Sequence, residues 1–309
     1  MTAYPEIAFV VVSYNTRELL LECLASAAES AASAEYELVV VDNASEDGSA
    51  EAVRTVFPQS TVITNQSNRG FAAACNQGIQ ATKAAFVLLL NSDAQLTPPA
   101  LKALRDCMRN ERCEAAGCRL VNGNGAELVN TMNFLTPLNQ ALELLGTPKR
   151  LGWKALTRNH YPRLTGPGPA CSVDWIEGSC LLVRRRTLEE TGLLDERFFM
   201  YSEDEDLCLR LRKIGWSVCF TDAGTAIHHS GASAEKCKAE MLVQFYMSQM
   251  KLLLKHRSRA SVMVYRVANW ASLTLKRVFR MLTGQRRRVE ELSLRIAALK
   301  EACRREGCN

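Results

Sequence analysis

Leu88–Asp93 reads Leu-Leu-Leu-Asn-Ser-Asp, and this stretch decides how the fold of the chain is interpreted. Its three leucines are the end of an unbroken apolar run that also includes Phe86. A short run of this kind is typical of a strand buried on both faces of a parallel sheet. The run ends in Asn91 and Asp93, and ligands of open α/β sheets lie outside the carboxyl ends of strands. An Asp at that position can hold a hard divalent cation, and the cation can hold a diphosphate.

Strands and helices alternate along the chain before this stretch. The expected strands are Ile7–Val12, Glu37–Val41 and Thr61–Thr64. The expected helices begin after an Asn15/Glu18 capping box, at Gly48-Ser49, and at Phe71, and the last of them runs to Ala81. This alternation predicts right-handed βαβ units, and therefore an α/β fold with a mostly parallel central sheet flanked by helices.

After Asp93, Thr97 followed by Pro98 predicts the start of a helix, and the order of the later elements is less regular. Asn122–Gly125 predicts a hairpin turn, Val173–Val183 one strand interrupted at Glu177-Gly178, and Val218–Thr221 and Ala226–His229 two further strands. Residues 131–170 are rich in Pro and Gly and lack a clear period, so we expect acceptor contacts there. From Glu235 onward the pattern predicts helices.

Length and cysteine usage limit the classes of protein that fit. A chain of 309 residues can bury a large core in one or two domains. Its twelve cysteines are scattered and form no CxxC pair, which argues against disulfides or structural zinc and indicates a reducing cytosol. No basic segment precedes the first apolar run and no apolar span reaches about 18 residues, so we expect neither a signal peptide nor a transmembrane helix.

Charge is distributed unevenly along the chain. Thirteen Lys and Arg and one acid lie between Lys236 and Arg288. This tract carries +12 within a chain whose net charge is +5, so the remainder carries −7. An acidic body with a basic tail predicts an anionic partner for the tail.

Several polar groups follow predicted strands, and each also has an ordinary structural explanation. Asp42 ends a Val-Val-Val strand, where it could accept from a nucleotide or simply meet solvent. Asn91-Ser92-Asp93 could form a metal–diphosphate site or an Asx turn. His228 closes an apolar strand, as a metal ligand or as a packed core histidine.

Four adjacent carboxylates, Glu203–Asp206, begin a predicted helix. Acids stabilise the first turn of a helix through its dipole, but one or two would suffice for that purpose. Like charges and partial burial raise a carboxylate pKa, which suits a general base. The sequence contains neither GxxxxGK[ST] nor a GxGxxG after a strand, so a P-loop NTPase and an ordinary dinucleotide fold are disfavoured.

In their order along the chain, these pieces resemble the family 2 inverting glycosyltransferases of the GT-A fold, and most closely the bacterial rhamnosyltransferase-like branch. The resemblance covers about residues 6–235. The matching segments are Val10–Asn15, Val41–Ser45, Asp47–Ser49, Asn68–Ala72, Leu89–Asp93, Trp175–Gly178, Glu203–Arg210 and His228.

The resemblance implies a role for each matching residue. Asp204 would be the catalytic base, and Glu203 would orient the acceptor. A divalent cation, Mg²⁺ or Mn²⁺, would be held by Asp93 and His228, with His229 as the alternative to His228. Asp93 matches the last position of the family's DXD motif, and Asn91 departs from its first. The nucleotide would be bound by Ser13, Asn15, Asp42, Asn68, Gly70, Asn91 and Ser92, and the acceptor or sugar by Trp175, Glu177 and Gly178.

The function that the resemblance implies is transfer of a sugar from a nucleoside-diphosphate donor to a hydroxyl group. The donor would be dTDP-L-rhamnose or a UDP-sugar, and the acceptor a glycan or lipid-linked molecule of cell-surface polysaccharide synthesis. Two other classes remain open: a sugar nucleotidyltransferase, although Ser13–Thr16 lacks its Gly-rich basic loop, and a non-catalytic nucleotide-sugar-binding scaffold.

The expected domains are a GT-A domain over residues 1–235 and a basic amphipathic helical extension over residues 236–309. The mixture of Leu, Val, Met and Trp270 with Lys and Arg is typical of a helix on an anionic membrane surface. We therefore expect a cytoplasmic enzyme, peripheral on the cytoplasmic face of the inner membrane. A helical subdomain packed on the enzyme is the alternative, and nucleic-acid binding is disfavoured because no reader motif is present. Apolar residues spaced three and four apart over Val289–Cys303 suggest a short coiled coil and a homodimer, and they fit a solitary amphipathic end-helix equally well.

Overall fold

The computed structural model describes residues 5–32, 34–140, 171–229 and 238–307, and the segment 141–170 where we expected acceptor contacts lies outside them. The chain forms two compact units. One, here the sheet unit, comprises Met1–Met132, Tyr161–Glu196 and Glu203–Ser233. The other, here the helical unit, comprises Asn133–His160, Arg197–Ser202 and Ala234–Asn309. The boundary expected at residue 235 stays a prediction.

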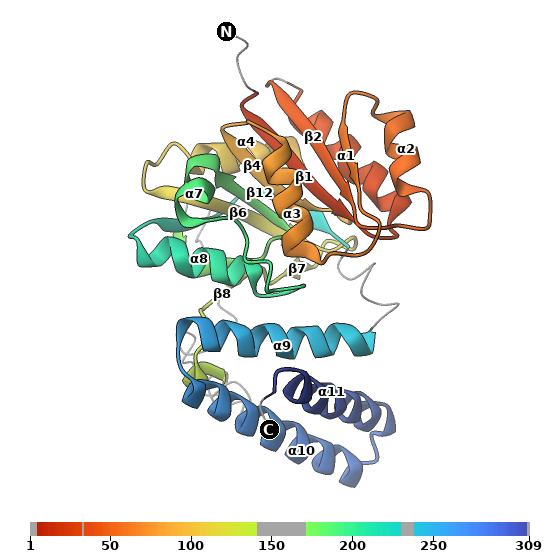
Figure 1. The fold of residues 1–309 in the computed structure, drawn as a ribbon, viewed down its shortest axis with the longest axis vertical. Helices are drawn as coiled ribbons and strands as arrows, with labels where there is room; N and C mark the ends of the chain where they lie inside the picture. The colour runs from red at the N-terminus through yellow and green to blue at the C-terminus, as the bar shows by residue number, and fades with distance from the viewer. Residues whose placement is uncertain (1–4, 33, 141–170, 230–237, 308–309) are drawn as a thin grey trace. The chain divides into compact units, whose positions relative to one another are not determined.

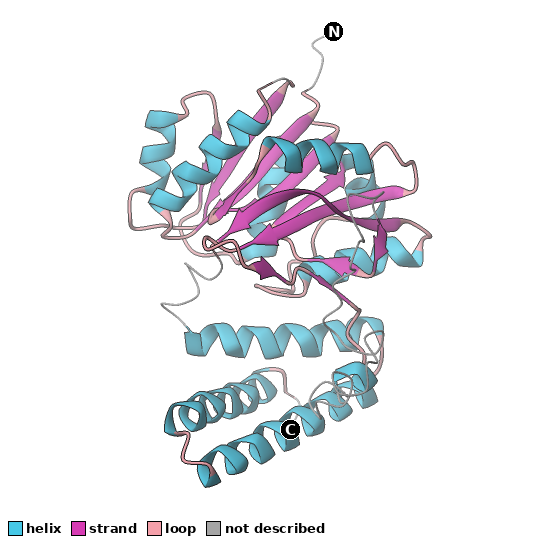
Figure 2. Ribbon diagram, turned by 180° about the vertical axis from the view of Figure 1, so that it is seen from behind, coloured by secondary structure: helices cyan, strands magenta, loops and turns pink. Residues whose placement is uncertain are grey.

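A large mixed sheet forms the middle of the sheet unit (Figures 1 and 2). Its first half is parallel, in the order β3 (Thr61–Thr64), β2 (Tyr36–Asp42), β1 (Ile7–Ser13) and β4 (Phe86–Asn91). Its second half continues with β11 (Cys180–Arg184), β6 (Cys113–Val121), β12 (Ser217–His228) and β5 (Ala94–Gln95). Strand β4, which contains the apolar run before Asn91, is buried as that run predicts. The predicted α/β fold with a mainly parallel central sheet is confirmed.

Helices cover both faces of the sheet because successive strand residues point to opposite sides. Ile7, Phe9 and Val11 belong to the apolar core shared with α1 (Arg17–Ser30) and α4 (Pro98–Cys107). The opposite face packs against α3 (Phe71–Ala81), which crosses the front of the sheet in Figure 1. Gly78 allows this close approach, since a Cβ there would lie 2.4 Å from Cγ1 of Val10. The remaining helices of the unit are α2 (Ser49–Val56), α7 (Arg185–Thr191) and α8 (Glu203–Lys213).

Strand register brings the polar strand ends to one edge of the sheet. Val12 is paired with Asn91, Ser13 with Asp42, and Asp42 with Thr64. The antiparallel strand β11 starts at this same edge, because Cys180 is paired with Leu90. The carboxyl ends of the parallel strands and the start of β11 therefore enclose one region.

The prediction of one strand over Val173–Val183 is wrong, because the structure contains three. β9 (Cys171–Val173) pairs with β12, and β10 (Trp175–Ile176) leaves the main sheet to pair with β8 (Thr131–Met132). β11 inserts between β4 and β6. The backbone changes partners at the break, where the N–H of Glu177 donates to the carbonyl of Asn130.

Two other local predictions differ from the structure, and one holds. The two strands expected around residues 218–229 are one bulged strand, β12, which continues beside β6. Gly224 lies at the bulge, where a Cβ would come within 2.4 Å of the Ala100 backbone. Asn15 does not cap α1, since Thr16 occupies the cap position. The hairpin is confirmed, with β7 (Glu127–Leu128) paired to β6.

The helical unit contains α9 (Lys238–His256), α10 (Arg259–Leu282) and α11 (Arg286–Arg305), as the C-terminal pattern predicts (Figure 1). α11 packs on both α9 and α10. Ile296 and Leu299 of the expected coiled-coil stripe are buried within the chain itself. Among the described residues, no helix has the length and apolar character needed to cross a membrane.

Candidate active site

A chain of hydroxyl groups connects the loops that follow β1 and β4. Ser13 is fully buried, and its Oγ lies 3.2 Å from Oγ1 of Thr16. Thr16 Oγ1 in turn donates to Ser92 Oγ at 2.8 Å. These bonds fix the loop after β1 against the Asn-Ser-Asp turn after β4, so the two predicted nucleotide-binding loops are held as one surface.

Asp42 lies at the carboxyl end of β2 with an unused acceptor atom. Its side chain is 2% exposed, and its Oδ2 accepts from the backbone N–H of Ser45 at 3.1 Å. Its Oδ1 has no hydrogen-bond partner among the described residues. A buried carboxylate oxygen without a partner costs free energy, so an incoming N–H or O–H donor would be strongly favoured there.

Asn15 and Asn43 hold the loops that border Asp42. Asn15 has a φ of 56°, and its Oδ1 accepts from the N–H of Glu46 at 2.8 Å instead of capping α1. Asn43 Nδ2 donates to Asn68 Oδ1 at 2.9 Å and to the Gly70 carbonyl at 3.2 Å. Asn43 was not among the predicted site residues, although its place directly after a strand-ending Asp was a signal for such a role.

Gly70 begins α3 with a φ of 85°, a backbone conformation that L side chains rarely adopt. The Gly70 N–H donates to Asn68 Oδ1 at 2.9 Å. Asn68 and Gly70, both predicted to bind nucleotide, are therefore organised through Asn43 next to the end of β2.

Asp93 and His228 form a close pair at the end of β4. His228 Nε2 lies 3.1 Å from Asp93 Oδ1, and each side chain is about one-tenth exposed. Pairing of β12 with β5 produces this contact, since His228 is paired with Ala94. The ring of His229, the alternative ligand, lies beside Gly123 of the hairpin turn, and only its backbone N–H bonds to Asp93.

The chemistry of this pair suits a divalent cation. Asn91 Nδ2 also lies 3.3 Å from His228 Nε2, so this nitrogen faces an amide group as well as a carboxylate. Imidazole nitrogens and carboxylate oxygens are both ligands of divalent cations, and in the absence of a cation a hydrogen bond can join the two atoms. The described residues contain no cluster of three or more His, Cys, Asp or Glu arranged to hold a metal. Two protein ligands fit a cation whose other ligands are phosphate oxygens and water.

Three carboxylates lie near the starts of β11 and α8: those of Glu177, Glu203 and Asp204. Asp204 Oδ2 accepts from the N–H of Gly178 at 2.8 Å, and its Oδ1 accepts from the N–H of Glu205 at 2.7 Å. Glu203, the preceding residue, is 4% exposed, and its Oε2 has no hydrogen-bond partner among the described residues. Backbone donors thus orient Asp204, while Glu203 keeps a free acceptor atom.

Electrostatics connect the carboxylates to the Asp93–His228 pair. Burial, and then the negative charge of Asp204, raise the pKa of Glu177 to about 7, whereas His228 opposes that rise. Burial, and then the charge of Asp204, raise the pKa of Glu203 well above its ordinary value. Glu177 is therefore close enough to sense both Asp204 and His228, so the predicted base and the predicted cation ligands lie at the same edge of the sheet.

Trp175 and Gly178 were predicted to contact the acceptor or the sugar. Trp175 is 5% exposed, and its strand pairs with Met132, so most of its ring is used in packing. Gly178 is adjacent to Phe71, whose ring would lie 3.6 Å from a Cβ at that position. Their roles toward a ligand stay predictions.

Comparisons with known proteins identify the family and the fold of this chain. The family model described as Glycosyl transferase family 2 matches residues 8–169. N-acetylglucosaminyl-diphospho-decaprenol L-rhamnosyltransferase of Mycobacterium tuberculosis is 29% identical over 235 residues, which are 72% of this chain and 75% of that protein. The low-salt glycan biosynthesis hexosyltransferase Agl10 of Haloferax volcanii is 23% identical over 273 residues, covering 86% and 80% of the two chains.

Two solved structures share the fold. The mannosyltransferase PcManGT from Pyrobaculum calidifontis, in complex with GDP-Man and Mn²⁺, superposes with a TM-score of 0.55 at 15% identity over 97% of this chain and 88% of that one. GalNAc-T7 with UDP, GalNAc and Mn²⁺ gives 0.56 at 14% identity over 82% of this chain. This chain spans about half (48%) of the GalNAc-T7 chain.

Proposed function

Because this chain belongs to glycosyl transferase family 2, we propose that it moves a sugar, with inversion, from a nucleoside-diphosphate donor to a hydroxyl of a lipid-linked acceptor. The coarser statement, a hexosyltransferase-type enzyme of glycan or polysaccharide biosynthesis with the GT-A fold, follows from the comparisons. Family membership leaves the sugar nucleotidyltransferase alternative without support. The observation that carries the proposal is the bond from Gly178 to Asp204, which holds a carboxylate at the sheet edge where Asp93 and His228 meet.

Binding of the nucleotide falls to the ends of β1, β2 and β4. Asp42 Oδ1 accepts from a nucleobase N–H or a ribose O–H, which removes its unpartnered state. Ser13 and Ser92, joined through Thr16, border the same surface. Asp93 and His228 would hold a divalent cation, Mg²⁺ or Mn²⁺, which supplies positive charge beside the leaving diphosphate. The Mn²⁺ in both structural neighbours supports this assignment.

Proton removal falls to Asp204. Its carboxylate accepts the proton of the acceptor hydroxyl as that oxygen attacks the anomeric carbon from the face opposite the diphosphate. The bond between the anomeric carbon and the diphosphate oxygen breaks, and its electron pair leaves with the diphosphate. Glu203, whose raised pKa favours the protonated form, donates a hydrogen bond that orients the acceptor.

The names of the relatives guide the choice of donor and acceptor. The mycobacterial relative is named as an L-rhamnosyltransferase that acts on a decaprenol-linked sugar, and the Rhamnosyltransferase WbbL of Escherichia coli is 43% identical over 58 residues. These names favour dTDP-L-rhamnose over a UDP-sugar, and a polyprenyl-diphosphate sugar as acceptor. Such an acceptor would place the reaction on the cytoplasmic face of the inner membrane.

The test incubates the full chain with Mn²⁺, a polyprenyl-diphosphate N-acetylglucosamine and one nucleotide sugar at a time. Mass spectrometry of the lipid follows transfer, and thermal shift with each nucleoside diphosphate follows binding. We expect one donor to extend the lipid, and its nucleoside diphosphate to raise Tm only when Mn²⁺ is present. A protein that neither transfers a sugar nor is stabilised by any nucleoside diphosphate would contradict the proposal.

A further inference from the structure

α10 of the helical unit has two apolar faces, but its own unit covers only one of them. The covered face packs within the unit through the buried residues Val262, Tyr265, Asn269, Ser272 and Leu273. The opposite face, here the outer face of α10, leaves Trp270 51%, Leu275 67% and Leu282 82% exposed. Its other large apolar members are also exposed: Met263, Val264, Val267, Val278, Phe279 and Met281. An exposed apolar stripe along a helix of about 36 Å marks an interaction surface.

The charge around this face has one sign. α10 carries five Lys and Arg and no Asp or Glu, and Arg286–Arg288 follow directly at the start of α11. Arg259, Arg266 and Arg277 are spaced so that they fall along one border of the outer face. A basic border around an apolar stripe is the pattern of a helix that lies in the interface of an anionic bilayer.

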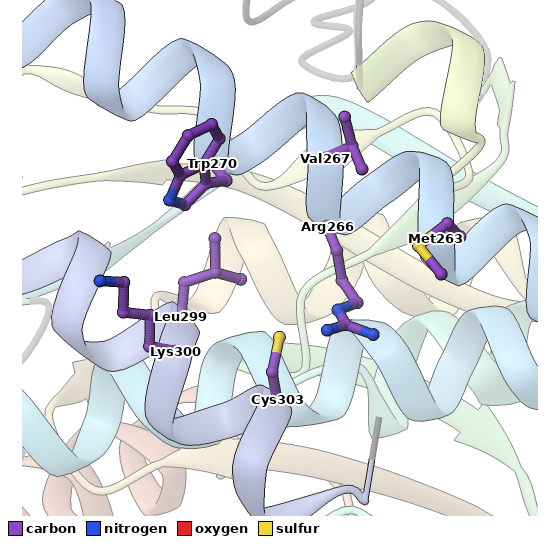
Figure 3. A pocket seen from close by; sticks show the side chains of 7 residues that line it. All are labelled: Met263, Arg266, Val267, Trp270, Leu299, Lys300 and Cys303. Carbon is purple, nitrogen blue, oxygen red and sulfur yellow. The ribbon is translucent and has the colours of Figure 1, made fainter. Parts of the chain in front are cut away.

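A cavity of about 300 Å³ opens beside the outer face, between α10 and α11 (Figure 3). Apolar side chains of both helices line it, and Trp270 and Leu299 point into it. Arg266 and Lys300 lie on opposite sides of Leu299 in this view. A trough with an apolar lining and a cation on each side matches the acyl chain and phosphate group of an anionic lipid.

We propose that the outer face of α10 docks on an anionic lipid bilayer, with the helix parallel to the membrane plane. The proposal does not depend on the identity of the donor or the acceptor. A spanning orientation is excluded for α10 by its charged residues, as no described helix is apolar enough to cross. A second copy of the chain is disfavoured as the occupant, because pairing two outer faces would bring together two surfaces of like charge, each with three arginines along its border.

The first experiment measures sedimentation of the full chain with vesicles of phosphatidylcholine alone or with 30% phosphatidylglycerol. We expect binding to the anionic vesicles and little to the neutral ones. Leu275→Glu with Val278→Glu should weaken that binding more than tenfold, since each change removes an apolar side chain from the interface. Val56→Glu with Ile214→Glu, at two positions outside α10 that are each 55% exposed, introduces the same two charges elsewhere and should bind like the wild type.

The second experiment removes the two cations beside the cavity. Arg266→Gln with Lys300→Gln should lower the partition coefficient about fivefold for each removed cation, and only with anionic vesicles. Trp270 fluorescence should shift to the blue on binding, and Trp270→Phe should lose most of the shift while still sedimenting. Thermal melts of every variant check that the helical unit remains folded.

Three outcomes would overturn the proposal. Equal binding to neutral and anionic vesicles would show that the basic residues around the outer face do not contribute to binding. Unchanged binding by the folded Leu275→Glu, Val278→Glu variant would show that the outer face of α10 is not the surface that contacts the bilayer. A dimer in analytical ultracentrifugation that dissociates in the same variant would identify a second copy as the occupant.

Discussion

Two glutamates of the sheet unit are buried to a similar extent, yet their surroundings are opposite. Glu114 on β6 is fully buried, and Arg186 Nη2 lies 2.7 Å from its Oε1. Arg184 Nε lies 3.2 Å from its Oε2 as an ion pair, and the Thr187 hydroxyl donates to the same oxygen. Glu203 at the start of α8 is 4% exposed, and its Oε2 has no partner among the described residues.

Glu114, which is paired, therefore stabilises the fold. Glu203, which leaves one oxygen without a partner, lowers the free energy of unfolding. Buried ionisable groups are ordinarily paired, so a paired group needs no further explanation. An unpartnered carboxylate with a raised pKa beside Asp204 is the kind of exception that clusters at functional sites. Substituting Glu114 should therefore affect stability, and substituting the carboxylates near Asp204 should affect activity.

Glu114→Ala tests the paired side of this comparison and has the largest expected effect on folding. The change leaves Arg184, which is 19% exposed, without its counter-ion, and should lower the free energy of unfolding by about 3–5 kcal/mol. Urea denaturation followed by circular dichroism measures the loss. Glu189→Ala, which removes an exposed partner 3.9 Å from Arg185, is the control and should cost less than about 1 kcal/mol. Equal losses in the two variants would contradict the structural role of Glu114.

Asp204→Asn tests the carboxylates that we assign to the transfer reaction. The amide keeps the shape of the side chain but cannot accept a proton, so the turnover rate should fall by about 10²–10⁴-fold. Affinity for the nucleoside diphosphate, measured by titration calorimetry, should change less than about threefold, because we assign Asp204 to the acceptor and not to the nucleotide. Asp106→Asn on the surface of α4 is the matched control and should transfer sugar like the wild type. Joint loss of transfer and nucleotide binding would discredit the assignment of the base.

The elements that the sequence predicted well are those whose signal is local. The run Phe86–Leu90 becomes β4, and the helix predicted over Phe71–Ala81 is α3 with the same bounds. Thr97 caps α4 by accepting from the N–H of Ala100, as a Thr followed by Pro indicates. In each case the side chains that determine the element lie within it.

The predictions that failed depend on contacts between distant segments. Asn15 has the sequence of a helix cap, but its side chain binds Glu46 across 31 positions, so no local pattern reveals its use. The break of Val173–Val183 into three strands depends on which strand each piece meets. For the same reason the sequence could predict roles for Asp93, Asp204 and His228 from their motifs, but it could not show that Glu177 is close enough to sense both Asp204 and His228.

Glu203→Gln is expected to raise stability while it lowers transfer, the reverse of the pattern for Glu114. Because the folded-state pKa is raised, the folded protein binds the proton more tightly than the unfolded chain, and stability falls as pH rises above the unfolded value of about 4.3. The amide avoids this penalty, so the free energy of unfolding of the variant should exceed that of the wild type at pH 8 by about 1–3 kcal/mol, the usual cost of a buried polar group without a partner, and by little at pH 4.

Chemical denaturation at the two pH values gives the difference for Glu203→Gln. Glu205→Gln is the control, since Glu205 is buried in the same helical turn but its oxygens are not left without hydrogen bonds. It should show no gain at pH 8. A destabilised Glu203→Gln variant would mean that Glu203 is paired like Glu114, and the comparison would fail.

Glu177→Gln should give the smallest change in the free energy of unfolding, and that change should develop over a defined pH range. The pKa of Glu177 is raised to about 7, so the free-energy cost of its charge develops between about pH 4.5 and pH 7 and then stays constant. Glu177 is partly accessible to solvent, so the gain of the variant over the wild type should be about 1–2 kcal/mol above pH 7 and near zero at pH 4. Repeating the pH series in Asp204→Asn should shrink the gain, because the charge of Asp204 contributes to the raised pKa. A gain that is independent of both pH and Asp204 would place Glu177 away from the carboxylates and leave Asp204 without an electrostatic link to His228.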